Sequence, residues 1–315
     1  MKFVLAALLL AIAPAHAQTY PAKPVRVIVA FTPGGVTDII ARTLMPKLAD
    51  LWGQPVVVEN RPGAGGSLAA QLVARAPADG HTLLVHSSGY SINAALQPKL
   101  PYDPRDLVDV APLASQAQVL VVNPASGIHS VGDLIAAAKA KPGEVTYGSA
   151  GIGSGAHFNA EKFRIAAGIE VLHIPYKGGA EAINDTVAGR LAFTFNTITL
   201  ALPYIRDGRL RVLAVSSTQR SAILPDVPTV AESGVPGFEF TFWNGLWAPA
   251  GTPAPIVEKI ARDLSQVVAM PDVRERLDRL GADPMTMTPA EFARFVRAET
   301  EAAERIVRVS GIKAQ

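Results

Sequence analysis

Short β-rich runs alternate with helical patterns along most of this 315-residue chain, and glycine-rich turns lie at many of the joins. A strand is predicted at 25–30 and a helix at 37–51, and a similar series runs from a strand at 119–122 to a strand at 210–215. Strands that alternate with helices favour parallel sheets covered by helices on both faces. The pattern therefore predicts an α/β fold.

The C-terminal part has a different pattern. An extended segment is expected at 238–247, followed by helices at 253–270, 271–280 and 289–309. Thr252 and Thr288 each precede a proline, which is typical of an N-cap residue followed by the first helical position. At one to two hundred residues per domain the length predicts two domains, so we interpret the chain as two α/β lobes that share one helical tail.

The first seventeen residues are typical of a cleavable secretory signal. Lys2 supplies a positive charge, residues 3–13 are apolar, and Ala15-His16-Ala17 matches the small-x-small cleavage pattern. The apolar run is too short to cross a bilayer core of ~30 Å. We therefore expect a mature chain that begins at Gln18 and is exported to a bacterial periplasm.

Composition excludes several classes of function. The net charge is only +2, which is too small for a nucleic-acid-binding protein, and the chain has no cysteine, so disulfides and thiolate chemistry are excluded. The histidines show no pair at metal-ligating spacing, and no nucleophile elbow or P-loop motif is present. We expect no catalytic residue, no metal and no cofactor.

Two glycine-rich turns lie between a predicted strand and a predicted helix, at residues 31–38 and 148–157. Glycine lets the backbone approach a ligand closely, and a helix N-terminus offers free N–H groups and the positive end of a dipole. In open α/β sheets, ligands bind at the carboxyl ends of strands, where these turns lie. The turns are predicted to face each other across a cleft that holds an anion, although each also fits an ordinary strand-to-helix turn.

Other interpretations of the glycine turns are less well supported. Glycine at every second position from 151 to 155 is similar to a dinucleotide-binding loop, but Glu170 precedes the next strand instead of ending it. His157 is a candidate to line the cleft, whereas His173 lies in a strand pattern and fits a structural role. A third glycine turn, at 61–67, fits packing or hinge roles as well as ligand contact.

A series of short strings, in order along the mature chain, resembles one known family. The strings are Tyr20-Pro-Ala-Lys-Pro24, Pro33-Gly34-Gly35 with Asp38, Val58-Glu-Asn-Arg-Pro-Gly-Ala-Gly-Gly66, Asp79-Gly80, Pro101-Tyr102-Asp103, His173-Ile-Pro-Tyr-Lys-Gly-Gly179, Leu224-Pro-Asp-Val-Pro-Thr229 and Ala248-Pro-Ala-Gly-Thr-Pro253. Together they resemble the TctC/Bug family, the periplasmic solute-binding receptors of tripartite tricarboxylate transporters.

The resemblance implies a type II periplasmic-binding-protein fold, in which two α/β lobes close over a small carboxylate. We expect lobe 1 at 18–119 plus 244–315 and lobe 2 at 120–243. The implied partners are a di- or tricarboxylate or an aromatic carboxylate, and the membrane permease subunits of the transporter. The receptor is expected to be a monomer and not an enzyme.

The ligand-binding residues that the resemblance implies come from the glycine turns and two other positions. They are Pro33, Gly34, Gly35, Thr37, Asp38 and Asn93 from lobe 1, and Ser149, Ala150, Gly151, Ser154, His157 and Asn196 from lobe 2. Phe31, an apolar residue at the end of the first strand, is a further candidate for contact with the solute, and it also fits a core position. Asn196 lies where family members often carry aspartate, which favours a dicarboxylate or aromatic carboxylate over an amino acid. Asp38→Ala is expected to weaken solute affinity more than it lowers the stability of the unliganded protein.

Two alternatives stay open from the sequence alone. A sensory receptor that binds the same solute and signals through a membrane kinase would share all of these features. A periplasmic enzyme acting on a carboxylate would need a nucleophile–base or acid–base pair in the cleft, and no spacing pattern supports one.

Overall fold

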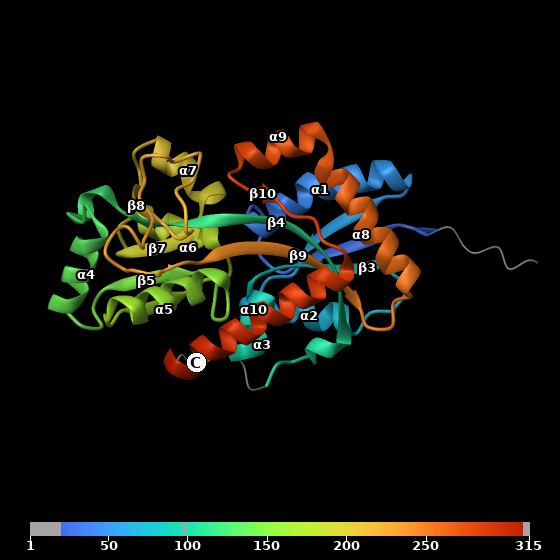
Figure 1. Ribbon diagram of the computed structural model, residues 1–315, viewed down its shortest axis with the longest axis horizontal. Coiled ribbons are helices and arrows are strands. Elements are labelled where there is room, and N and C mark those ends of the chain that lie inside the picture. Colours follow the sequence, from blue (N-terminus) through green and yellow to red (C-terminus); the bar gives the residue numbers. More distant parts are fainter. Residues whose placement is uncertain (1–19, 97–98, 311–315) are drawn as a thin grey trace, which may run out of the picture.

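The computed structural model describes residues 20–96 and 99–310, so the predicted signal segment 1–17 lies outside the described residues. Two α/β lobes lie side by side, and two long strands run between them (Figure 1). These crossing strands are β4 (Leu107–Val122) and β9 (Thr241–Pro249). The architecture confirms the predicted two-lobed α/β fold.

Each lobe has its own set of strands and helices. Lobe 1 contains β1 (Val25–Val29), β2 (Val56–Asn60), β3 (Thr82–Ser87), β10 (Asp283–Pro284), α1 (Val36–Trp52), α2 (Ser67–Ala74), α3 (Gly89–Leu96), α8 (Ala254–Ala269), α9 (Pro271–Arg279) and α10 (Pro289–Ser310). Lobe 2 contains β5 (Thr146–Ser149), β6 (Leu172–Pro175), β7 (Phe193–Thr197), β8 (Arg211–Val215), α4 (Val131–Ala140), α5 (Gly155–Ala167), α6 (Gly179–Val187) and α7 (Ile198–Arg206). Single 3₁₀ turns occur at Ala64–Gly66, Pro104–Asp106 and Pro124–Ser126.

The sheet is mixed, with the strand order β2-β1-β3-β9-β4-β7-β5-β6. β1 pairs in parallel with β2 and β3, and β5 pairs in parallel with β6 and β7. β4 pairs antiparallel with β7, β8, β9 and β10, and β9 also pairs antiparallel with β3. The expectation of parallel sheets is therefore wrong in part, because each crossing strand enters a sheet from the other lobe rather than through a βαβ connection.

β4 is shared between the lobes. It pairs with β9 from Leu107 to Ala117 and with β7 from Gln118 to Val122. The chain returns to lobe 1 through β9, which begins at Thr241. These pairings support the division into 18–119 plus 244–315 and 120–243, which we propose as the lobe boundaries.

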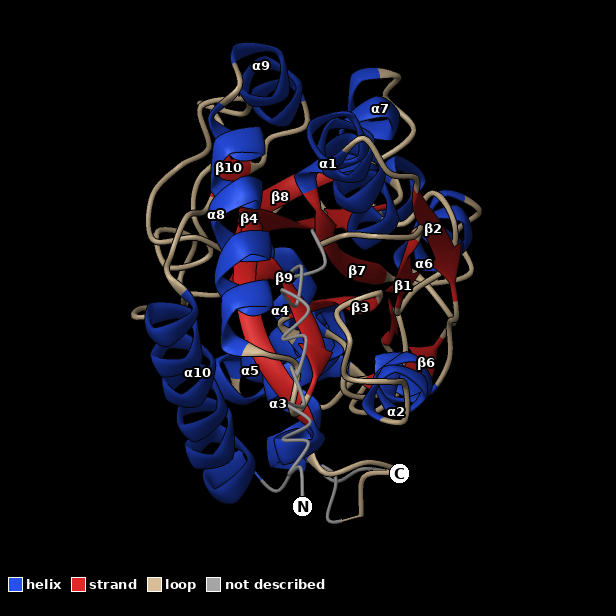
Figure 2. Ribbon diagram, turned by 90° about the vertical axis from the view of Figure 1, so that its right-hand side faces the viewer, coloured by secondary structure: helices blue, strands red, loops and turns tan. Residues whose placement is uncertain are grey.

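Helices cover both faces of the strands in each lobe (Figures 1 and 2). In lobe 1, α1 and α8 pack in one apolar cluster with Val27 and Val85, whereas α2 and α10 pack in another with Ile28 and Leu84. These residues alternate along β1 and β3, as expected for strands buried on both faces. In lobe 2, α4 and α5 share one cluster and α6 and α7 share another.

The helical tail agrees closely with its prediction, except that Pro253 and not Thr252 is the N-cap of the first helix, and the Thr252 hydroxyl donates to the Pro249 carbonyl at 2.7 Å instead. The helix predicted at 253–270 is α8, at Ala254–Ala269, and its buried residues Val257, Ile260 and Leu264 follow helical spacing. Thr288 caps α10 as expected. The Glu291 N–H donates to Thr288 Oγ1 at 3.3 Å, and Glu291 Oε2 accepts from the Thr288 N–H at 2.8 Å.

Two longer elements escaped the sequence prediction, besides the two-residue strand β10. The first is α3, whose sequence Gly-Tyr-Ser-Ile-Asn-Ala-Ala-Leu is rich in weak helix formers and whose burial follows no single stripe. The second is the N-terminal part of β4, where Asp109 and Pro112 interrupt the β-rich run and the pairing with β9 shifts register. In both cases tertiary packing outweighs weak local preference.

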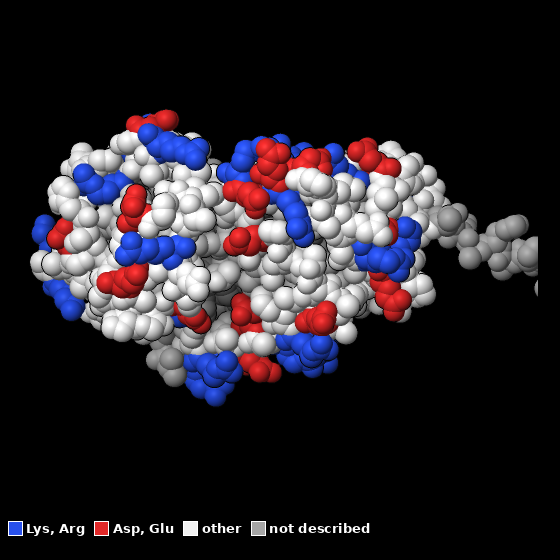
Figure 3. Space-filling model, turned by 45° about the horizontal axis from the view of Figure 1, so that its top comes forward, with Lys and Arg blue, Asp and Glu red and all other residues white. Residues whose placement is uncertain are grey.

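The surface carries charges of both signs. Basic and acidic side chains are interspersed on the face drawn in Figure 3, in keeping with the net charge of +2. Within the described part of the chain, the helices include none that combines the length and the apolar character needed to cross a membrane.

Candidate functional site

A small cavity lies between the two lobes, where several strands end. Its lining consists of Phe31, Gly35, Val36, Thr37, Ser87, Gln118, Ala150, Ser154, Gly155, Ala156, Gly179, Asn196, Thr197, Leu200 and Phe242. The free space is about 30 Å³, which is room for one or two water molecules. The lobes therefore stand close together, and a larger molecule enters only if the lobes or the lining side chains move.

Four helices begin at this cavity. α1 begins at Val36, α5 at Gly155, α6 at Gly179 and α7 at Ile198, directly after Thr197. Each of them contributes a lining residue from its N-cap or its first residue. Helix N-termini present free N–H groups and a partial positive charge, so four of them converging from both lobes favour an anion.

The lining contains no charged side chain. Its polar members are Thr37, Ser87, Gln118, Ser154, Asn196 and Thr197. The buried Thr197 hydroxyl has no hydrogen-bond partner among the described residues, so it is available to a bound molecule. Asn159 Nδ2 donates to Gln118 Oε1 at 2.7 Å, which orients the Gln118 carboxamide. Neutral donors of this kind suit a carboxylate that is held by hydrogen bonds.

Hydrogen bonds within lobe 1 fix the conformation of its glycine turn. The Gly35 N–H donates to the Thr32 carbonyl at 3.1 Å, and Gly34 has a positive φ of 75°. Asp38 Oδ2 accepts from the Gly34 N–H at 2.9 Å, and its Oδ1 accepts from Arg42 Nε and Asn60 Nδ2, both at 2.8 Å. The carboxylate is therefore fully engaged within lobe 1, and it lies outside the cavity lining.

Asp38→Ala is expected to act on both stability and binding. The affinity loss predicted from the sequence stays a prediction, and the loss of three hydrogen bonds to the buried Asp38 carboxylate adds a stability cost of about 1–3 kcal/mol. Urea unfolding of the unliganded protein measures this cost, and calorimetry with the bound carboxylate measures the affinity. Asp50→Ala, at an exposed position of α1, is the control and should change neither quantity. Unchanged stability in Asp38→Ala would contradict the bracing role.

The lobe 2 glycine turn contacts two histidines whose rings lie against each other, tilted by 30°. Ser149 Oγ lies 2.6 Å from His173 Nε2, and the His157 and His173 ring centroids are 4.3 Å apart. The Gly153 N–H donates to His157 Nδ1 at 3.3 Å. Burial lowers the pKa of His157 to about 4, and burial together with the neighbouring His157 lowers the pKa of His173 to about 3. Both rings are neutral at pH 7 and support the turn from beneath.

The distance between Ser149 and His173 is that of a nucleophile–base pair, but neither side chain is accessible from the cavity. Ser149 is fully buried, and its hydroxyl also accepts from the Gly151 N–H at 3.1 Å. Neither Ser149 nor His173 belongs to the cavity lining. Among the residues that the structure describes, no group of three or more His, Asp or Glu side chains is arranged to hold a metal.

The structure divides the predicted ligand-binding residues into two groups. Phe31, Gly35, Thr37, Ala150, Ser154 and Asn196 line the cavity. Pro33, Gly34, Asp38, Asn93, Ser149, Gly151 and His157 lie outside the lining, and we now interpret them as residues that shape the turns or the contact between the lobes. Asn93 is an example, because its Nδ2 donates to the Gly65 carbonyl at 3.0 Å.

Sequence reasoning missed several lining residues. Ser87, Gly179 and Thr197 lie at strand ends or helix starts, so the rule that found the two glycine turns also applies to them. Gln118 and Phe242 belong to the crossing strands. No local sequence pattern marks them, because their position depends on how the lobes are joined.

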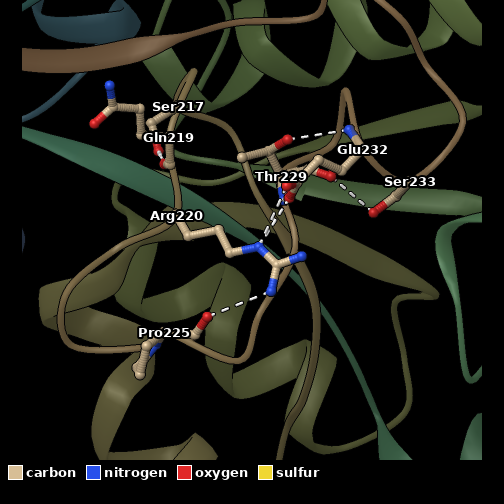
Figure 4. Close-up of polar contacts among 7 residues, drawn as sticks. All are labelled: Ser217, Gln219, Arg220, Pro225, Thr229, Glu232 and Ser233. Carbon is tan, nitrogen blue, oxygen red and sulfur yellow. Dashed lines mark hydrogen bonds and ion pairs between the residues drawn. The ribbon is translucent and has the colours of Figure 1, made fainter.

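A larger hollow of about 500 Å³ lies beside the loop between β8 and β9. Figure 4 shows how this loop is braced: Arg220 Nε lies 3.0 Å from Glu232 Oε2, and Ser233 Oγ donates to the Thr229 carbonyl at 2.7 Å. Asp278 and Asp283 also line this hollow, together with Arg220, which is paired with Glu232. With the charge of Arg220 offset by Glu232, the two aspartates disfavour an anion, so the smaller cavity is the better candidate for carboxylate binding.

The two-lobed fold, with a cavity between lobes at the strand ends, is that of a periplasmic solute-binding receptor. Within this class, the chain belongs to the tripartite tricarboxylate transporter receptor family, TctC, whose family model matches residues 40–312. This confirms the resemblance found in the sequence. The family and the fold are those of solute-binding receptors.

Relatives and solved structures agree with this assignment. BugT of Bordetella pertussis is 40% identical over 304 residues, which cover 96% of this chain and 93% of BugT. R. palustris Rpa4515, solved with adipate, has a TM-score of 0.90 at 34% identity, covering 93% of this chain and 99% of that chain. MatC from Rhodopseudomonas palustris, solved with bound malate, has a TM-score of 0.88 at 33% identity, covering 91% and 100%.

Proposed function

We propose that this protein is a periplasmic receptor that binds a small carboxylate in the cavity between its lobes. The observation that carries the proposal is the convergence of the N-termini of α1, α5, α6 and α7 on a cavity without charged side chains. An anion there is stabilised by backbone N–H groups and helix dipoles. The adipate- and malate-bound relatives support a carboxylate as the anion.

The remaining lining suggests how the body of the solute is held. Phe31, Val36, Leu200 and Phe242 supply apolar surface beside the polar groups. Pockets of this composition use a few polar groups for orientation and apolar contact for the rest. This favours a dicarboxylate, a tricarboxylate or an aromatic carboxylate. None of the lining side chains is negatively charged, so none can pair with the ammonium group of an amino acid.

The proposed mechanism is capture by closure. The solute enters when the lobes are apart and then contacts lobe 1 through the Gly35–Thr37 turn and lobe 2 through the Ala150–Ala156 turn. Because it touches both lobes only in the closed form, it binds that form more tightly and shifts the population toward it. The closed receptor then delivers the solute to the permease subunits of a tripartite tricarboxylate transporter in the inner membrane.

A thermal-shift screen tests the carboxylate assignment. The panel contains malate, adipate, citrate and benzoate, with glucose as an uncharged control. A solute at 100 times its Kd stabilises the folded protein by about 2.7 kcal/mol, so at least one carboxylate is expected to raise the Tm by several degrees, and calorimetry then gives its Kd. A protein that none of the carboxylates stabilises would not be the receptor proposed here.

A further inference from the structure

Glycines lie at several of the closest contacts between the two lobes. Gly65 faces Ile152, Gly153 faces Asn93, Gly155 faces Ser88, and Gly178 faces Thr32. Gly65 and Gly153 have φ values of +62° and +79°, so their own backbone conformation favours glycine. Gly155 and Gly178 have no positive φ, so their backbone conformation does not explain why glycine occupies these two positions.

Gly178 is the N-cap of α6, with an extended backbone at φ −161° and ψ 166° that any residue adopts. A Cβ at this position would overlap Thr32 Oγ1 and would lie 3.3 Å from Thr32 Cβ, both in the lobe 1 turn. The nearest atom of lobe 2 itself is Glu181 Oε2 at 2.8 Å, at the end of a flexible side chain. Glycine is therefore favoured here by the facing lobe rather than by the local fold.

Gly155 shows the same relation on another side of the cavity. It is the first residue of α5, a place where alanine would favour the helix more than glycine does. A Cβ would lie 2.8 Å from Ser88 Oγ of lobe 1 and 2.8 Å from Phe242 Cδ2 on the crossing strand β9. Both distances are shorter than ordinary van der Waals contact, so either these side chains or the lobes themselves would have to shift.

We propose that Gly155 and Gly178 set the distance to which the lobes close, and thereby determine which size of solute the cleft retains. The proposal rests on the proposed function, in which closure traps the solute. With no Cβ at these positions, the lobes approach in this structure until about 30 Å³ of free space is left between them, which is closer than a bound solute allows. One added methyl group keeps the lobes apart, weakens their simultaneous contact with a short solute and favours a longer one.

The test uses two variants and a matched control. Gly178→Ser adds a Cβ and keeps a residue type preferred at N-caps, and Gly155→Ala adds a Cβ at a helix start. Gly132→Ala in α4 is the control, because a Cβ there meets Ser130 Oγ only at an ordinary 3.6 Å. All three are expected to keep the wild-type Tm without solute, so a binding change in the first two reports on closure rather than on folding.

The distance between the lobes is measured directly with spin labels. The chain has no cysteine, so Asp50→Cys in α1 and Lys139→Cys in α4, both at exposed positions, provide two unique labelling sites. The wild type and Gly132→Ala are expected to populate a short distance in part without solute and fully with it, whereas Gly178→Ser and Gly155→Ala shift to longer distances. With malate and adipate as probes, affinity should fall at least tenfold for malate and less for adipate.

A second substitution provides a rescue. Thr32→Ala removes the atom that the new Cβ of Gly178→Ser would overlap, so the double variant should recover the short distance. The proposal is overturned if the wild type never populates the short distance, if both glycine variants keep it, or if Thr32→Ala fails to restore it. The distances are also measured without solute. If no carboxylate of the panel binds, that result contradicts the proposed function, and the distances without solute still decide whether Gly155 and Gly178 limit the closure of the lobes.

Discussion

Replacing Ala156 with leucine is expected to abolish carboxylate binding, with a loss of affinity of at least a hundredfold. Ala156 lies in the first turn of α5, is 6% exposed and lines the cavity. A leucine side chain adds three carbons to a space of about 30 Å³, where the carboxylate would meet the N–H groups of α5. The solute then loses both the room and the helix N-terminus that the proposed function requires.

The measurement is calorimetric titration with whichever carboxylate stabilises the wild type most. Overpacking costs typically about 1–3 kcal/mol, and the existing free space reduces that cost, so the unliganded variant should still unfold cooperatively. Ala140→Leu, at the exposed C-terminal end of α4, is the matched control and should bind with wild-type affinity. An affinity within threefold of the wild type in Ala156→Leu would place the binding site elsewhere.

The alternating pattern predicted the α/β fold because each strand and helix of the two lobes carries its own local signal. β1 is a run of β-branched residues apart from Arg26, and α8 has a clear apolar stripe. The crossing strands were harder to predict. β4 is sixteen residues long, and its first part contains Asp109 and Pro112, so its identity as a strand depends on its pairing with β9.

For the candidate site, the sequence predicted less than it did for the fold. The strand-end rule located both glycine turns, but it could not say which side chain of a turn faces the cavity. Thr37 lines the cavity and the adjacent Asp38 braces the turn from inside lobe 1. Ala150 lines it and the adjacent Ser149 lies buried against His173. Neighbouring residues thus face opposite sides of a turn, and only tertiary contacts determine which.

The glycine-rich composition has more than one physical cause in this protein. Gly34 adopts a backbone conformation that favours glycine. Gly179 brings a helix N-terminus to the cavity. Gly178 permits the approach of the opposite lobe. An anion receptor with a net charge of only +2 thus relies on local backbone dipoles and close approach rather than on its overall charge.

Acid is expected to destabilise the unliganded protein by several kcal/mol between pH 6.5 and pH 4. Burial lowers the pKa of His86 and His157 to about 4, and burial with its histidine neighbour lowers the pKa of His173 to about 3, from an ordinary value of 6.5. As pH falls below 6.5, the unfolded chain takes up protons that the folded protein excludes. Each full shift is equivalent to roughly 3 kcal/mol, present above pH 6.5 and lost as the pH approaches the folded-state pKa.

Urea unfolding at pH 7, 6, 5 and 4 measures this dependence. His157→Gln stays neutral and can still accept from the Gly153 N–H, so its free energy of unfolding should fall less steeply with acid than that of the wild type. His129→Gln, at an exposed position, should leave the slope unchanged. Identical slopes in all three proteins would mean that His157 does not support the lobe 2 turn in its neutral form. Because that turn contributes Ala150 and Ser154 to the cavity, solute affinity should decline over the same pH range.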